Sequence, residues 1–247
     1  MTRSAKETPQ RVRMTGDLTN RTGIAAQYHA EEMREGALAF TPRGAENEYR
    51  LFRGALLRDG GPIGTLPKPA SLRGAAKQGM AAMTGQRPLV LLDKLAERLA
   101  FERTGTRLYE SVLLKLDREG PYEGGPTRGE LETICAEERE HFETLCGFVE
   151  QLGGDPTAVT PSADVAAVAS LRLIQVVGDP RIGVPESLEA MLIAELVDND
   201  AWKIVRGLAE EAGRDDLIAF AQRAENEEDR HLAWVRTWVK SHVLGAP

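Results

Sequence analysis

One short pattern occurs twice in this chain and limits what the chain can fold into. Residues 138–141 read Glu-Arg-Glu-His and residues 228–231 read Glu-Asp-Arg-His, so both have the form Glu-x-x-His. In an α-helix, positions i and i+3 lie on the same face about one turn apart. A carboxylate and an imidazole at this spacing can bind one metal ion from the same side. The sequence therefore contains two candidate halves of a metal site.

The residues around the two patterns indicate that both face a core. Apolar residues recur at helical spacing on either side of each pattern. They are Leu131, Ile134, Phe142, Leu145 and Val149 around the first pattern, and Leu217, Ala221, Ala224, Leu232 and Val235 around the second. A buried carboxylate is costly unless it is paired or bound to a metal. Two buried Glu-His pairs therefore require a cation.

Two further acids interrupt apolar stripes of the same kind. Glu102 lies among Leu92, Leu95, Leu99, Thr106, Tyr109, Leu113 and Leu116, and Glu195 lies among Leu188, Met191, Leu192 and Val205. Four predicted helices thus carry, in order, Glu, Glu-x-x-His, Glu and Glu-x-x-His. The four acids fall near the middle of their helices and follow one another after 36, 57 and 33 residues. This spacing predicts two short hairpins joined by one long crossover.

This ligand set and this order of connections resemble the di-iron carboxylate bundles of the ferritin-like superfamily, and within it the rubrerythrin-like proteins, over roughly residues 89–243. The resemblance implies an all-α fold, a ferritin-like four-helix bundle with one long crossover. It also implies two bound iron ions, with manganese at one position as the alternative. The implied ligands are Glu102, Glu138, His141, Glu195, Glu228 and His231. Glu138 and Glu228 would bridge the two ions, Glu102 and His141 would serve one, and Glu195 and His231 the other.

Tyr109 is the first candidate for a catalytic role. It follows Glu102 by seven residues, almost two helical turns, and so shares the inner face. It is either a core tyrosine whose hydroxyl needs a partner, or a hydrogen-bond donor to a ligand carboxylate of the opposite helix. The second role is implied by the Glu-x6-Tyr spacing of rubrerythrins and bacterioferritins. The second half of the chain departs from that pattern, since Trp202 occupies the corresponding position after Glu195.

Asp198 is the second candidate. It lies one turn after Glu195, where rubrerythrins carry an additional carboxylate ligand used in peroxide reduction. Aspartate is one methylene shorter than glutamate, so we consider binding through water, binding in one redox state, or a hydrogen bond to His141 or His231. The alternative is that Asp198 belongs to a solvated acidic run with Asp200.

Gly105 lies inside the first predicted helix of the bundle, three residues after Glu102. A glycine in a helix interior costs about 1 kcal/mol relative to alanine. Close packing of a neighbouring helix beside the metal site would explain why it is there.

The formal net charge of −7 is unevenly distributed. Residues 1–88 contain 14 Lys and Arg against 8 Asp and Glu, whereas residues 89–247 contain 17 against 30. The chain therefore divides into a basic N-terminal extension, 1–88, and an acidic bundle, 89–247. We expect the extension to form short helices over 24–38, 45–58 and 71–82 and to pack on a bundle, its own or a neighbour's. It has few aromatic residues, so we expect no nucleic-acid partner.

The two cysteines bear on the compartment and on the electron donor. Cys135 and Cys146 lie on one predicted helix, about 16 Å apart along its axis, so they cannot bridge each other. We expect a cytoplasmic protein, with neither a secretory signal nor a transmembrane helix. No Cys-x-x-Cys pair is present, so the chain lacks the rubredoxin-type iron site of full-length rubrerythrins. The electron donor is therefore expected to be external.

The function expected from this resemblance is that of a di-iron oxidoreductase of the peroxidase or oxidase type, which reacts with hydrogen peroxide or dioxygen. Three alternatives stay open. One is an iron-binding storage protein that oxidises ferrous iron, another a di-iron oxygenase acting on an organic substrate, and the third a metal-free structural bundle. Ferritin-type storage needs a large hollow shell, whereas we expect a homodimer.

Overall fold

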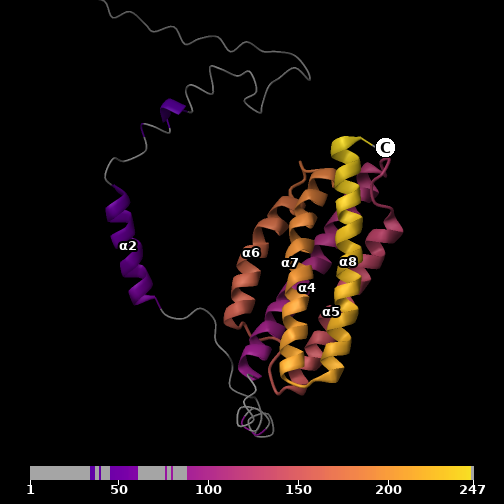
Figure 1. Cartoon of the computed structure of the whole chain (residues 1–247). Helices are drawn as coiled ribbons and strands as arrows, with labels where there is room; N and C mark the ends of the chain where they lie inside the picture. Colours follow the sequence, from indigo (N-terminus) through magenta and orange to yellow (C-terminus); the bar gives the residue numbers. More distant parts are fainter. Residues whose placement is uncertain are drawn as a thin grey trace, which may run out of the picture. The chain divides into compact units, whose positions relative to one another are not determined.

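The structure of the chain is a computed structural model that describes residues 34–36, 39, 45–60, 76, 79 and 88–245. The described residues form α-helices and turns, and no strand occurs among them, which confirms the predicted all-α class (Figure 1). The elements are α2 (Ala45–Asp59), α4 (Pro88–Glu119), α5 (Arg128–Gln151), α6 (Pro161–Gly178), α7 (Val184–Glu211) and α8 (Asp215–Leu244).

The chain separates into two compact units, Met1–Gly61 and Pro62–Pro247. The first contains α2, which confirms the helix expected over 45–58. The helices expected over 24–38 and 71–82 lie largely outside the described residues. The second unit contains α4 to α8.

Four long helices of the second unit form the predicted bundle. α4 packs against α5, and α7 packs against α8, so each hairpin pairs consecutive long helices. The connection from α5 to α7 is the long crossover, and it contains α6, which packs on α4 and α7 at the outside of the bundle (Figure 1). The four-helix bundle with one long crossover is therefore confirmed.

Contacts at both ends hold α6 along α4. At its start, the carboxylate of Asp93 accepts hydrogen bonds from the backbone N–H of Ser162 at 2.9 Å and from its hydroxyl at 2.7 Å. At its end, the buried Lys115 ammonium donates to the carbonyl oxygens of Asp179, at 2.8 Å, and of Ile182. The crossover helix thus lies parallel to α4 and covers it.

Helix boundaries follow local signals in the sequence. The side chain of Thr127 accepts a hydrogen bond from the backbone N–H of Glu130 at 3.2 Å, and the Glu130 carboxylate accepts one from the backbone N–H of Thr127 at 2.8 Å. This is a capping box, which starts α5. Gly120 and Gly213 follow α4 and α7 with φ angles of +80° and +62°, a conformation that glycine adopts without strain.

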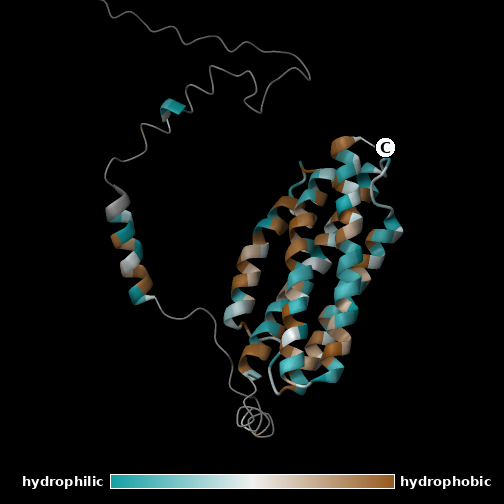
Figure 2. Ribbon diagram, viewed as in Figure 1, coloured by the Kyte–Doolittle hydropathy of each residue, from teal (hydrophilic) through white to brown (hydrophobic). Residues whose placement is uncertain are grey.

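Two apolar clusters fill the bundle on either side of the level at which the four acids lie. In Figure 2, apolar and polar residues alternate along the bundle helices, as expected for helices with one face turned to a core. The first cluster includes Leu108, Tyr109, Ile134, Leu188, Met191, Val235 and Trp238. The second includes Leu92, Leu95, Leu145, Val205, Leu217 and Ala221. The acids therefore interrupt the core at one level.

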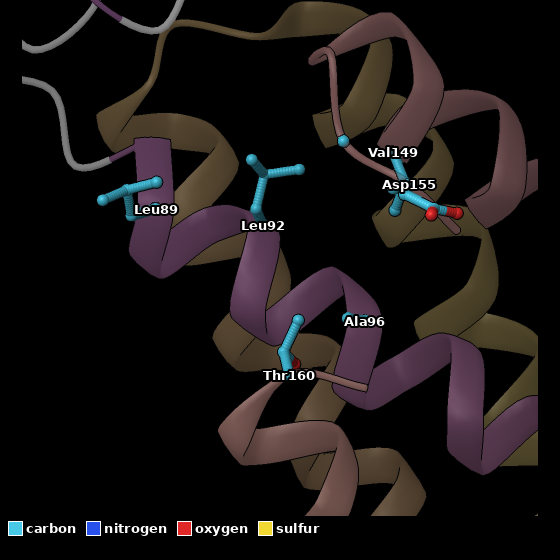
Figure 3. Close-up of a pocket in the computed structure, with 7 residues that line it drawn as sticks. Leu89, Leu92, Ala96, Val149, Asp155 and Thr160 are labelled. Carbon is cyan, nitrogen blue, oxygen red and sulfur yellow. The ribbon is translucent and has the colours of Figure 1, made fainter. Parts of the chain in front are cut away.

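Figure 3 shows a mostly apolar pocket at the end of the bundle where α4 begins. It is lined by Leu89, Leu92, Ala96, Val149, Gly154, Asp155 and Thr160, and none of the predicted metal ligands lines it. None of the described helices combines the length and the apolar composition needed to cross a lipid bilayer.

Candidate metal centre

The six side chains predicted as ligands come together between the two apolar clusters. Each of them is at most 2% exposed. They are Glu102 on α4, Glu138 and His141 on α5, Glu195 on α7, and Glu228 and His231 on α8. A carboxylate and an imidazole from each Glu-x-x-His pattern therefore do point into the bundle, as the apolar stripes around them indicated.

Candidate ligand atoms form overlapping groups, within each of which all atoms lie within 4.8 Å of one another. One group contains Glu102, His141 and Glu228. A second contains Glu138, Glu195, Glu228 and His231, and a third contains Glu102, Glu138, Asp198 and Glu228. Glu228 is common to all three, and Glu102 and Glu138 are each common to two. The cluster is thus able to hold metal, with Glu102 and His141 on one side and Glu195 and His231 on the other.

His141 turns one ring nitrogen toward the cluster and the other away from it. Its Nδ1 atom lies 3.2 Å from Oε1 of Glu228 and 3.5 Å from Oε2 of Glu102. Its Nε2 atom lies 2.8 Å from Oε2 of Glu227. A proton on Nε2 that is donated to Glu227 leaves Nδ1 free to act as a metal ligand.

His231 has the same arrangement in the other half of the site. Its Nδ1 atom lies 3.3 Å from Oε2 of Glu228, 3.8 Å from Glu138 and 4.0 Å from Glu195. Its Nε2 atom lies 2.7 Å from Oε2 of Glu137. The two outer carboxylates therefore link α5 and α8. Glu227 on α8 contacts His141 on α5, and Glu137 on α5 contacts His231 on α8.

Sequence reasoning missed Glu137 and Glu227, although a signal for them is present. Each stands directly before the glutamate of a Glu-x-x-His pattern, so the full repeat is Glu-Glu-x-x-His. In a helix, adjacent residues point about 100° apart, which explains why the first glutamate reaches the neighbouring helix while the second faces the centre.

Five atoms of the predicted ligands are buried without a hydrogen-bond partner. These are Oε2 of Glu102, Oε2 of Glu138, Nδ1 of His141, Oε2 of Glu195 and Oε1 of Glu228. A buried polar atom without a partner costs about 1–3 kcal/mol. A cation coordinated by these atoms would remove this cost, so the donor set fits a metal ion. Its mixture of carboxylate oxygen and imidazole nitrogen suits iron or manganese.

Crowding of acids and burial move the pKa values of the carboxyl groups apart. Burial, together with repulsion by the Glu228 carboxylate, raises the pKa of Glu195 to about 8 and that of Glu138 well above its usual range. Burial also raises the pKa of Glu228, but the imidazoles of His141 and His231, whose Nδ1 atoms lie 3.2 Å and 3.3 Å from its carboxylate oxygens, outweigh burial and hold this pKa at about 2. Glu228 therefore stays ionised without a metal, and so does Glu102, because the nearby Arg98 and His141 outweigh burial and lower its pKa.

The pKa values of the two imidazoles are raised, although burial alone would lower them. Burial lowers the pKa of each, but hydrogen bonds to carboxylates outweigh it and raise the pKa of His141 to about 12 and that of His231 to about 10. In the metal-free protein the cluster is thus held together by protons on its histidines and on part of its acids. A metal ion would have to replace these protons.

Gly105 makes room for one of the carboxylates. A Cβ atom at this position would lie 2.8 Å from Cδ of Glu138. The space that a side chain at position 105 would fill is therefore occupied by the Glu138 carboxylate of the neighbouring helix α5.

The hydroxyl of the fully buried Tyr109 donates a hydrogen bond to Oε1 of Glu195 on the opposite helix. Burial and the nearby carboxylates of Glu195 and Glu138 raise the pKa of Tyr109 well above its usual value, so this phenol keeps its proton. Trp202, at the corresponding position of the other half, packs edge-on against the His141 ring at 5.3 Å between centroids. The two halves therefore support the cluster differently.

Asp198 contacts a residue that the sequence analysis did not identify. It is 2% exposed and forms an ion pair with Arg98 on α4, which also donates to Glu102. Asp200, in contrast, is exposed and pairs with Lys203 at 3.2 Å. The interpretation of Asp198 as part of a solvated run with Asp200 is therefore wrong, because the helix turns the two side chains to opposite sides. A possible signal for Arg98 was its position one turn before Glu102 within an apolar stripe.

A family model described as the Ferritin-like domain matches residues 128–242. The match spans α5 to α8 and contains both Glu-x-x-His patterns and Glu195, whereas α4 with Glu102 precedes it. Neither the curated proteins nor the solved structures yield a match to the chain.

Proposed function

This chain belongs to the ferritin-like superfamily, and from this premise we propose that it is a di-iron oxidoreductase that reacts with hydrogen peroxide or dioxygen. Manganese at one of the two positions is the alternative composition. The rubrerythrin-like subtype, an external electron donor, a cytoplasmic location and a homodimeric state are parts of the same proposal.

One observation carries the proposal. Each half of the centre has a buried histidine whose Nδ1 atom faces the carboxylates, while its Nε2 atom is held by a glutamate from the opposite helix. A histidine that binds a metal commonly donates its other ring N–H to a carboxylate, which fixes the tautomer and the ring orientation. This arrangement occurs twice around one cluster of acids, as expected for a pair of metal positions.

The ligands divide between the two positions. Glu102 and His141 would hold one ion, Glu195 and His231 the other, and Glu138 and Glu228 would bind both. Iron bound by such a mixed oxygen and nitrogen set supplies the electrons for reduction of peroxide or dioxygen.

Other residues of the chain orient the ligands and exclude water. Tyr109 keeps its proton and donates a hydrogen bond to Glu195, which orients the carboxylate of that metal position. Glu137 and Glu227 hold the histidine tautomers. The apolar clusters above and below the acids keep bulk water from the centre.

Anaerobic loading with ferrous iron tests the proposal. Metal analysis after removal of free iron should give two iron ions per chain. Addition of peroxide or dioxygen should then produce the near-ultraviolet absorption of oxygen-ligated ferric iron, and faster oxidation by peroxide would assign the peroxidase type. A folded protein that retains no iron would rule out this function.

The family match favours a second candidate, an iron-binding protein that oxidises ferrous iron for storage. Storage requires many chains in a hollow shell and the uptake of iron far beyond two ions per chain. The mass of the protein in solution separates the two candidates, because a dimer has no interior in which to store iron.

A further inference from the structure

Arg98 is the cation buried beside the candidate metal centre. It is 1% exposed, and its Nη2 atom donates to both Oε1 of Glu102 and Oδ1 of Asp198. The guanidinium also lies 5.0 Å from the ring centroid of Phe101 and 5.3 Å from that of Trp202. A buried arginine is tolerated where carboxylates pair with it and aromatic faces stabilise its charge. Its position is therefore well defined by contacts from two helices.

Asp198 is close enough to the centre to bind a metal ion. One of its oxygens lies within 4.8 Å of candidate ligand atoms of Glu102, Glu138 and Glu228. It also follows Glu195 by three residues, so both carboxylates project from the same face of α7. What decides whether Asp198 serves as a ligand is thus its pairing with Arg98.

The charges of the metal-loaded centre are balanced if Asp198 stays in its ion pair with Arg98. The four glutamates of the centre carry four negative charges when ionised, which two divalent ions neutralise. The Arg98–Asp198 pair adds no net charge. An Asp198 released from Arg98 would add a fifth anionic group, and a buried centre with unbalanced charge is costly.

We propose that Arg98 is a positioning residue that holds Asp198 in an ion pair, so that this carboxylate does not bind metal alongside the four glutamates. The same guanidinium orients Glu102 through its second hydrogen bond. This inference rests on the proposed dinuclear centre. It assigns Asp198 a structural charge instead of the role of an additional ligand.

Cobalt(II) binding to the full-length, chelator-treated protein tests the inference. Cobalt does not oxidise readily under these conditions, and its visible spectrum reports the number of ligands. The variants are Arg98→Met, Asp198→Asn and the double variant, and the affinity is measured by competition with a chelator. Arg98→Met frees Asp198, so cobalt should bind at least about tenfold more tightly, with a weaker visible absorption as coordination increases. Asp198→Asn should weaken binding, because the charge of Arg98 is then unbalanced.

The double variant gives the decisive result. If the pair is neutral and Asp198 is not a ligand, removing both charges should restore the wild-type spectrum and an affinity within about threefold of the wild type. If Asp198 is a ligand in the wild type, both Asp198→Asn and the double variant lose affinity together, and the inference fails. It also fails if Arg98→Met lowers the melting temperature with an unchanged cobalt affinity and spectrum.

Two further variants guard against misfolding and non-specific effects. Arg98→Lys keeps the charge but cannot hold two carboxylates with one planar group, so it should give a shift in the same direction as Arg98→Met but smaller. Lys115→Met removes another buried cation of α4, which contacts backbone carbonyls of the crossover instead of the centre, and should leave cobalt binding unchanged. A wild type that binds no cobalt overturns the proposed function itself, whereas cobalt binding without the expected pattern overturns only the role of Arg98.

Discussion

Gly105 on α4 and Glu138 on α5 approach each other so closely that no side chain fits between them. A Cβ atom at position 105 would lie 2.8 Å from the Glu138 carboxyl carbon, inside the distance at which non-bonded carbon atoms are found. A glycine at this helical position costs about 1 kcal/mol relative to alanine. Because position 105 has no side chain, the Glu138 carboxylate can lie at the level of the other acids.

Gly105→Ala should therefore weaken metal binding by displacing the Glu138 carboxylate, by about tenfold or more for a loss of roughly 1.4 kcal/mol. Chelator competition with cobalt(II) measures the affinity. Gly207→Ala on α7 is the matched control, since a Cβ there meets nothing within 4 Å. It should stabilise the protein slightly and leave metal binding unchanged. Equal metal affinities for both variants would contradict the role assigned to Gly105.

Glu227→Ala and Glu137→Ala should each weaken metal binding by about 10–100-fold, because each histidine loses the carboxylate that holds its Nε2 proton. Glu227→Ala should weaken the metal position that contains His141, and Glu137→Ala the metal position that contains His231. Metal titration with two resolved binding steps separates the effects. Glu140→Ala removes an exposed carboxylate of α5 paired with Arg223, and should leave both steps intact.

His141→Ala and His231→Ala should each weaken one metal position selectively. The imidazole nitrogen of each faces a different group of carboxylates, so its loss leaves the other group complete. Metal content after dialysis against a weak chelator should fall from two ions to one per chain in both variants. Two tightly retained ions in both variants would show that the ligand assignment is wrong.

The melting temperature of the metal-free protein should fall as the pH rises. The protons responsible are those that metal binding should release. The raised pKa values of Glu195, about 8, and His231, about 10, mean that the folded protein binds these protons more tightly than the unfolded chain. Their stabilisation is complete below the unfolded pKa values and is lost as the pH rises through the folded ones. For these two groups the decline extends from about pH 5 to about pH 10, and His141, whose pKa is raised to about 12, continues it above pH 10.

Thermal unfolding with and without manganese(II) across this range measures the effect. The metal-loaded protein should melt at a higher temperature and depend less on pH, because bound metal replaces the protons. A metal-free protein whose melting temperature rises steadily between pH 6 and pH 9 would contradict the assignment of these pKa shifts.

Deleting residues 1–87 should leave the metal centre formed, since every candidate ligand lies in α4 to α8 and Pro88 is kept as the first residue of α4. Metal content and far-ultraviolet circular dichroism of the truncated protein measure this, and its elution volume reports whether the extension affects the oligomeric state. A truncated protein that folds but binds no metal would place part of the centre's support in the extension.

The sequence alone determined the four long helices of the bundle, the long crossover and the set of six side chains that meet in the core. The reason is that these features follow from local geometry. An i,i+3 pair such as Glu228 and His231 faces one side of any α-helix, and an apolar stripe shows which side is buried. The capping box at Thr127 and the position of Gly105 are equally local.

The tertiary structure decided which residues contact one another across the bundle. Arg98 and Asp198 are 100 positions apart, and His141 and Glu227 are 86 apart. Their pairing depends on how far each helix is rotated about its axis and on which helix lies beside it, and no periodicity in the sequence specifies this. Helical spacing leaves a side chain one turn from a ligand free to face metal, solvent or a neighbour. The packing of α7 against α4 turns Asp198 toward a neighbour, because it places the buried Arg98 guanidinium within reach of the carboxylate.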